Sequence, residues 1–197
     1  MDHHAVNDEA LDTIFRSARS QNEWQDKPVS TALLMAVYDL MRMGPTSANC
    51  SPARLLFLTT AEAKERLAQH ATHANQPKIR SAPATAIIGY DLDFAQRLPE
   101  LFPHDPTAKT WFADPAVEQV TAFRNGTLQG AYFIVAARAL GLDCGPMSGF
   151  DNAKVDAEFF AGTRVKSNFI CGIGYGDPAG LFARSPRLAF DDACKIL

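Results

Sequence analysis

The stretch Ser30–Leu58 reads STALLMAVYDLMRMGPTSANCSPARLLFL and combines a helix signal, a polar turn and a strand signal. Ser30 is a suitable helix cap, and apolar residues follow it along one helical stripe: Leu33, Leu34, Val37, Tyr38, Leu40 and Met41. We expect the helix to end near Gly44-Pro45, because proline cannot continue a helix. Residues 54–58 then predict a buried strand.

Further caps and apolar patterns predict five more elements: a short helix after Thr60, a strand over 85–90, a long helix from Asp114-Pro115 towards Leu140 with Gly141 at its end, a helix from Asp151 through Phe160 with Gly162 beyond it, and a strand over 166–174. The tail after Pro178 is expected to be mostly irregular. Helices and strands do not alternate regularly, and no repeat or Gly/Ser linker divides the chain. The sequence therefore predicts one α+β domain over residues 1–197.

Residues 91–113 are harder to place. Pro99, Pro103 and Pro106 break any long helix there, whereas Phe102 and Trp111 favour burial. One interpretation is an excursion that covers a pocket. The other is that its aromatic residues pack on the core or on a partner subunit, and both can hold together.

Composition excludes several function classes. The chain has 197 residues, 47% apolar and 21% charged, with a formal net charge of -3, so it resembles an ordinary globular protein rather than a polyanion binder. We expect no nucleic-acid partner, no membrane segment and no metal. Four widely separated cysteines form no C-x-x-C pair, and the polar, acidic start lacks the features of a secretory signal, which favours a cytoplasmic location.

Two familiar patterns are set aside. Residues 174–179 formally match a dinucleotide fingerprint, but no room follows for the rest of a βαβ unit. His70 and His73 have helical ligand spacing without an obvious third ligand, so a solvated helix face is the stronger interpretation. No P-loop or nucleophile elbow is present.

Four short stretches remain, and they mix cations with hydroxyl and amide groups: Ala18-Arg19-Ser20, Pro45-Thr46-Ser47-Ala48-Asn49, Asn75-Gln76-Pro77-Lys78 and Gly145-Pro146-Met147-Ser148-Gly149. Arg184 and Arg187 add two late cations. A phosphorylated flavin needs this mixture, because guanidinium groups hold phosphate oxygens and short polar groups bond ring heteroatoms. The alternatives are plain: solvated surface charges, a helix-ending turn at 45–49 and a tight glycine-proline loop at 145–149.

In order and wording, these stretches resemble the flavin-dependent nitroreductase family over nearly the whole chain. Within it, residues 44–54, Leu101-Phe102-Pro103, 145–151 and 174–177 are similar to the malonic semialdehyde reductase branch of the Rut route of pyrimidine degradation. The resemblance implies a mostly antiparallel sheet flanked by helices and an intertwined homodimer. It also implies one FMN at each of two subunit interfaces, with NADPH or NADH as electron donor.

The resemblance also implies a site for each stretch. Arg19, Ser20, Arg184 and Arg187 would lie near the FMN phosphate and ribityl chain, and Asn75 and Lys78 near the pyrimidine edge of the ring. Pro45, Thr46, Ser47 and Asn49 would come from the partner subunit, and Pro146, Met147, Ser148 and Gly149 would pass the N5 region. Two departures stand out: the family often has a basic residue where this chain has Ala18, and a glutamine where it has Ser51.

The implied reaction is a ping-pong reduction of malonic semialdehyde to 3-hydroxypropionate. No catalytic residue is assigned; Thr46 and Ser47 are candidates for the proton donor. Arg54 and Arg124 could each pair with a substrate carboxylate or a structural acid. The alternatives are a broad-specificity nitroreductase or quinone reductase and a flavin-binding protein without turnover.

Overall fold

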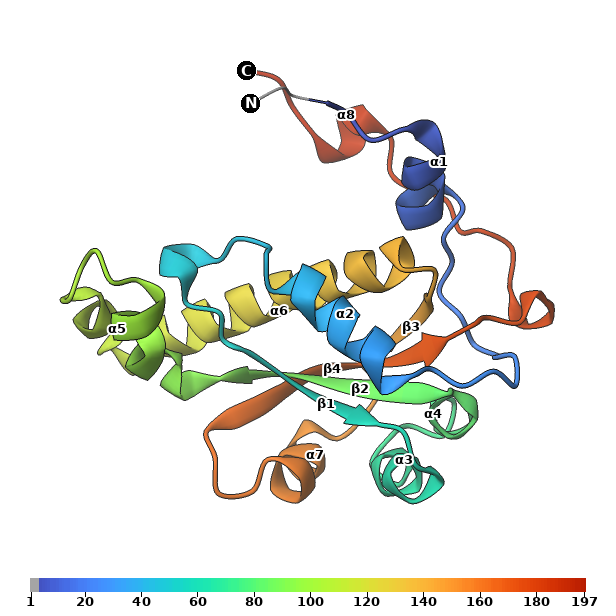
Figure 1. Ribbon diagram of the computed structural model, residues 1–197, viewed down its shortest axis with the longest axis horizontal. Helices are drawn as coiled ribbons and strands as arrows, with labels where there is room; N and C mark the ends of the chain where they lie inside the picture. The colour runs from blue at the N-terminus through green and yellow to red at the C-terminus, as the bar shows by residue number, and fades with distance from the viewer. Residues whose placement is uncertain (1–3) are drawn as a thin grey trace.

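A four-stranded antiparallel sheet forms the centre of the computed structural model, which describes residues 4–197; part of the acidic start considered above, residues 1–3, lies outside them (Figure 1). The strands are β1 (Ala53–Leu58), β2 (Ala84–Asp91), β3 (Asp143–Met147) and β4 (Val165–Gly174). Their order is β1-β2-β4-β3, and every pair is antiparallel. The predicted fold class, α+β with a mostly antiparallel sheet flanked by helices, is confirmed.

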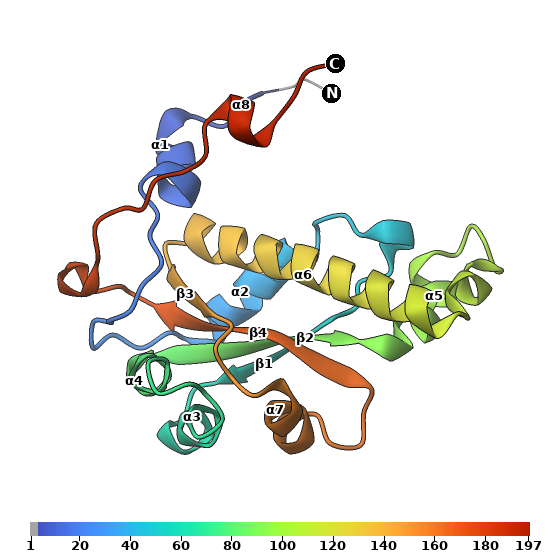
Figure 2. The same ribbon diagram turned by 180° about the vertical axis from the view of Figure 1, so that it is seen from behind.

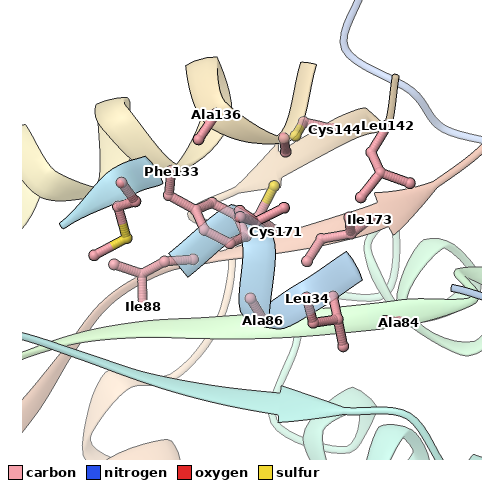
Figure 3. Packing of buried hydrophobic residues seen from close by; sticks show 13 residues of the cluster. Leu34, Ala84, Ala86, Ile88, Phe133, Ala136, Leu142, Cys144, Cys171 and Ile173 are labelled. Carbon is pink, nitrogen blue, oxygen red and sulfur yellow. The ribbon is translucent and has the colours of Figure 1, made fainter. Parts of the chain in front are cut away.

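Two helices, α2 (Thr31–Met41) and α6 (Pro115–Ala139), cover one face of this sheet (Figures 1 and 2). Phe133 of α6 is fully buried and packs in one cluster with Leu34 of α2 and with Ile88 and Cys171 of the sheet (Figure 3). Burying such side chains is the main favourable contribution to folding. The largely apolar residues 131–139 thus lie within a packed helix. No helix among residues 4–197 combines the length and apolarity needed to cross a bilayer.

The opposite face carries α3 (Ala61–Ala68), α4 (Gln76–Ser81) and α7 (Asn152–Phe159) (Figure 2). Leu67, Ile79 and Val155 from these helices are fully buried against Ile87 and Ile170 of the sheet. The inner strand β2 is therefore covered on both faces, which explains its unbroken apolar run.

The predicted helix caps are confirmed. Ser30, Thr60 and Asp151 each accept a hydrogen bond from a backbone N–H in the first turn of their helix. Asp114 accepts from two such groups at the start of α6. Gly141, just beyond α6, has φ of 77°, the left-handed conformation that glycine adopts without steric cost.

Three local features differ from the sequence expectations. Residues 143–147 form an edge strand, where a loop over 145–149 was the alternative to a flavin contact. β1 was expected to be buried, but it is half-buried. It lies at the edge of the sheet, where only β2 pairs with it and its other edge has no neighbouring strand. The helices α1 (Asp8–Leu11) and α4, and a π-helical turn over Asp12–Arg16, carried no clear apolar stripe and were not predicted.

The segment 91–113 folds into short turns, with 3-10 helices over Leu92–Arg97 and Ala108–Phe112 around α5 (Leu98–Leu101). Phe94 is fully buried and meets Phe112 edge-on, with ring centroids 5.0 Å apart. Trp111 remains 48% exposed. The aromatic residues of segment 91–113 thus pack largely on one another. That the segment covers a pocket stays a prediction.

The tail after Pro178 is mostly irregular, as predicted, apart from a 3-10 turn over Pro178–Gly180 and the short helix α8 (Phe190–Ala193). It runs beside α1 on the far side of α6 from the sheet in both views (Figures 1 and 2). Segments from the two ends of the chain are thereby brought together.

Candidate functional site

An arginine-lined cavity of about 460 Å³ lies where the two ends of the chain meet. We call it the arginine cavity; its lining residues are Phe15, Arg16, Ala18, Arg19, Ser20, Arg138, Arg184 and Arg187. Arg16 is paired with Asp8 and Asp12, and no carboxylate lines the cavity among the described residues. In a chain of net charge -3, this local excess of guanidinium groups indicates an anion-binding site.

Side-chain-to-backbone hydrogen bonds assemble the arginine cavity. Arg19 donates to the carbonyl of Phe182, and Arg184 donates to the carbonyl of Ala18 at 2.9 Å. Arg138, in the last turn of α6, donates to the carbonyl of Ile14 at 3.1 Å. The structure therefore brings together four predicted residues: Arg19, Ser20, Arg184 and Arg187. The bonds of Arg19 and Arg184 each join residues that are more than 160 positions apart in the sequence. Sequence reasoning missed Arg138, although a lone arginine within an apolar helix was a usable signal.

β3 continues from this cavity along the edge of the sheet. Ser20 forms a parallel bridge with Cys144, and the Gln21 N–H donates to the Cys144 carbonyl at 3.0 Å. Because backbone groups alternate along a strand, the backbone of Pro146 also faces this outer side. The N–H that Pro146 lacks is therefore not needed for pairing with β4, which is why an edge strand tolerates proline here.

Beyond the end of β3, Gly149 meets the segment that leads into α4. Its carbonyl accepts from the Thr72 N–H at 2.9 Å and from the Asn75 side-chain amide at 3.1 Å. A Cβ on Gly149 would lie 2.8 Å from both Asn75 Nδ2 and Thr72 Oγ1, so the close approach requires glycine. Lys78, one turn later, is half-buried, and its ammonium has no hydrogen-bond or ion-pair partner within residues 4–197.

These contacts thus join three of the four predicted stretches end to end, and we call residues 18–20, 144–149 and 75–78 the β3 band. It begins at the arginine cavity, follows the edge strand and ends at α4, which carries Lys78. Cations lie at both ends, and hydroxyl, amide and backbone groups lie between them. This is the mixture of donors that a phosphorylated ring compound needs.

The fourth stretch lies elsewhere and has an unusual backbone. Ala48, Asn49 and Ser51 have φ of 48°, 49° and 40°, a region that side chains other than glycine rarely adopt. Each such residue costs roughly 1 kcal/mol or more, except that asparagine tolerates it better. We call residues 45–51 the strained loop.

One face of α6 holds the strained loop in place. Asn125 Oδ1 accepts from the Ser47 N–H at 2.9 Å, and Gln129 Oε1 accepts from the Ala53 N–H at 2.8 Å. The Tyr132 hydroxyl donates to the Pro45 carbonyl at 3.0 Å. Asn125 and Gln129 are only 4% and 3% exposed, so their bonds are made away from water. Sequence reasoning missed them, although two amides four residues apart in a helix lie on one face.

Within the loop, Thr46 Oγ1 accepts from the Ser51 N–H at 3.1 Å, and Asn49 Nδ2 donates to the Leu101 carbonyl at 2.8 Å. Burial raises the pKa of the Cys50 thiol to about 11. Among the described residues no hydrogen bond joins the loop to the β3 band. The loop, cyan beside α5 in Figure 1, and α4 lie at opposite ends of the sheet.

The two unassigned arginines differ. Arg54 donates to Asp91 Oδ2 at 2.7 Å and to the carbonyls of Ser51 and Ala53, so it pairs with a structural acid. It lines a larger cavity, about 710 Å³, along the edge of β1, which contains none of the predicted flavin contacts. Arg124 is exposed and forms no ion pair with the residues that the structure describes.

His70 does not lie on a solvated helix face, so that interpretation is wrong. It follows the end of α3 and contacts Glu158, which Arg66 also pairs with at 2.6 Å. Arg66 first, and His70 second, hold the pKa of Glu158 below its usual value. The cluster joins α3 to α7. Within residues 4–197 no three His, Cys, Asp or Glu side chains gather as metal ligands, and all four cysteines are free.

Several known proteins resemble this chain in sequence or in fold. Residues 15–176 match the model of the nitroreductase family. A protein of Ralstonia pickettii named as an NADH dehydrogenase/NAD(P)H nitroreductase, HadB, is 60% identical over 190 residues, covering 95% of this chain and 97% of the relative.

Two solved structures share the fold. The nitroreductase YdfN of Bacillus subtilis has a TM-score of 0.87 at 18% identity, with 96% of this chain and 99% of that one covered. A nitroreductase of Exiguobacterium sibiricum, solved in complex with FMN, has a TM-score of 0.85 at 18% identity and covers all of both chains. On the family match and the close relative together, the chain belongs to the nitroreductase family.

Proposed function

We propose that this chain is an FMN-dependent NAD(P)H oxidoreductase of the cytoplasm that reduces malonic semialdehyde to 3-hydroxypropionate. The observation that carries the flavin part is the β3 band, in which contacts join three separate stretches and a cationic cavity lies at one end. The names of the relatives and the FMN-bound structure of a family member support the class of reaction.

The residues present fit FMN. The arginine cavity offers guanidinium donors and Ser20 without a lining carboxylate, which suits a phosphate dianion. Asn75 and Lys78 would hold the pyrimidine edge, and residues 146–149 would pass the ring beside them. Bound FMN supplies two-electron chemistry between a nicotinamide donor and the substrate. The unpartnered ammonium of Lys78 would stabilise negative charge on that edge in a poorly solvated site.

A second copy of the chain would complete the site with Pro45, Thr46, Ser47 and Asn49 of the strained loop. Within one subunit this loop lies at the opposite end of the sheet from α4. Large apolar side chains are exposed on α2, on the turn that follows it and on α6, including Met35, Met43, Val120 and Phe123. Such a surface favours burial in a homodimer.

Malonic semialdehyde carries a carboxylate, so the substrate proposal requires a cationic side chain that pairs with it. Arg124 is available, because it forms no ion pair with the described residues and directly precedes Asn125, which holds Ser47. Arg124→Ala should raise KM for malonic semialdehyde about tenfold or more while leaving KM for an uncharged quinone within about twofold. Lys195→Ala, which also removes an exposed cation, is the matched control. Equal effects on both substrates would argue against a carboxylate contact.

One experiment separates the three candidate functions. The purified protein is assayed for released cofactor and for NADPH and NADH oxidation with malonic semialdehyde, a quinone and a nitroarene. Efficient reduction of the nitroarene without the aldehyde would favour a broad-specificity nitroreductase, which the names of the relatives support. A flavin that NAD(P)H cannot bleach would indicate a binding protein. A colourless protein that binds no added FMN would contradict all three.

A further inference from the structure

Arg138 differs from the other arginines of the arginine cavity because it comes from a packed helix. It lies in the last turn of α6, whose neighbouring residues Ala136 and Ala137 are buried in the core. Its Nη1 donates to the Ile14 carbonyl at 3.1 Å. Its Nε is fully buried and has no hydrogen-bond partner among the described residues. One donor of a permanently charged group is therefore left unused beside the cavity.

An unpaired buried donor on a charged group is costly, and folded proteins rarely retain one without a partner. No carboxylate among the cavity-lining residues could serve as that partner. Arg184 is tied to the carbonyl of Ala18, whose own methyl side chain brings no charge to the cavity. A phosphate that enters the cavity would bring the missing negative charge to the Arg138 guanidinium, which lines the cavity and would turn its unused donors towards the phosphate oxygens.

We infer that Arg138 binds the phosphate group of FMN from the α6 side of the arginine cavity, and that it supplies the cation that Ala18 does not. The inference rests on the proposed function, because it takes FMN as the ligand. A phosphate offers acceptors on several sides, so Arg19, Arg184 and Arg187 from the chain ends and Arg138 from the helix can bond it together. Arg138 also links the phosphate to the core through α6, since its Nη1 fixes Ile14 of the turn preceding Arg19.

The test compares FMN with riboflavin, which has the same ring and ribityl chain but no phosphate. Dissociation constants are measured by flavin fluorescence for the wild type and for Arg138→Ala, Arg138→Gln and Arg138→Lys. Glutamine can keep a donor for the Ile14 carbonyl without the charge. Lysine keeps the charge but lacks the paired N–H donors of a guanidinium group. Arg42→Ala removes a surface cation that pairs with Asp39 outside the cavity and serves as the control.

We expect Arg138→Ala and Arg138→Gln to weaken FMN binding about 10- to 100-fold and riboflavin binding less than about twofold. Arg138→Lys should recover part of the loss, and Arg42→Ala should change neither constant. Arg138→Gln carries the test if the alanine variant does not fold. Equal losses for both flavins would show that Arg138 acts only by holding Ile14, and no loss would show that it does not reach the phosphate; either result overturns the inference. A wild type that binds neither flavin would instead overturn the proposed function itself.

Discussion

The arginine cavity and the strained loop obtain their geometry in opposite ways. The loop has an unfavourable backbone at Ala48 and Ser51, but buried side chains of α6 satisfy its polar groups. The residues that line the cavity have no positive φ, but Arg19, Arg138, Arg184 and Arg187 lie close together without acidic partners among the described residues. The loop is therefore complete within the fold, whereas the cavity still lacks a counter-charge.

This difference separates two kinds of site. Strain persists only where the surrounding structure over-determines it, so the loop depends on the stability of the fold. Uncompensated charge persists where a ligand later neutralises it, so the cavity depends on binding. Substitutions in the two regions should therefore change different measured quantities.

The largest effect is expected where the loop loses its support. The double substitution Asn125→Leu with Gln129→Leu removes two buried acceptors and leaves the Ser47 and Ala53 N–H groups without partners. Stability should fall by about 2–5 kcal/mol, measured by urea unfolding. Gln119→Leu, which removes an amide of α6 that bonds the Tyr90 hydroxyl, should cost less. A loss no greater than this control would show that the loop does not need α6.

The next effect concerns the cavity. Arg184→Ala should raise the dissociation constant of FMN about 10-fold and leave the stability of the protein without ligand within about 0.5 kcal/mol, because exposed charges contribute little to folding. Calorimetric titration with FMN and urea unfolding measure the two quantities. A large loss of stability with unchanged FMN affinity would reverse the comparison.

A smaller effect should follow from relieving the loop backbone. Ala48→Gly suits φ of 48° and should stabilise the protein by up to about 1 kcal/mol, less the contribution of the lost methyl group. Ala157→Gly, within the regular helix α7, should instead destabilise it by about 0.5–1 kcal/mol. Thermal unfolding of both variants gives the signs, and destabilisation by Ala48→Gly would mean that the conformation is not strained.

A separate effect depends on pH, and this dependence is absent near neutrality, where the Cys50 thiol is protonated in both the folded and the unfolded protein. The pKa of Cys50 is raised from its ordinary value of 9.0 to about 11 in the folded protein, so its contribution to stability is complete below pH 9 and is lost as pH rises towards 11. Wild type and Cys50→Ala should therefore differ less at pH 10.5 than at pH 7.5 in urea unfolding. A constant difference would show that the thiol is not buried as described.

Much of the fold could be predicted because its signals are local. Ser30, Thr60, Asp114 and Asp151 cap helices through bonds to residues two or three positions away, and such bonds are visible in sequence order. β3 was missed because its proline and glycine argue against a strand. Its outer edge tolerates them only in the tertiary arrangement that places Gln21 beside Cys144.

Sequence analysis named the candidate site residues that lie within motifs of the family. It missed the residues that support these motifs from distant parts of the sequence. The structure brings Arg19 together with Arg184, and Asn75 together with Gly149, although the contacts with a flavin remain predictions. Arg138, Asn125 and Gln129 belong to no quoted motif. Their roles follow from which face of α6 meets which loop, and that depends on how the helix is rotated against the sheet.

The junction of the two chain ends at the arginine cavity has a consequence for protein turnover. Residues 18–19 and 182–184 are joined by guanidinium-to-carbonyl bonds that hold like charges close together. An anion that neutralises these charges also holds the two segments together. Binding of the anion and packing of the two segments against each other are therefore coupled. An empty molecule would open there first and expose its tail to proteases. Proteases would thus distinguish an anion-bound molecule from an empty one.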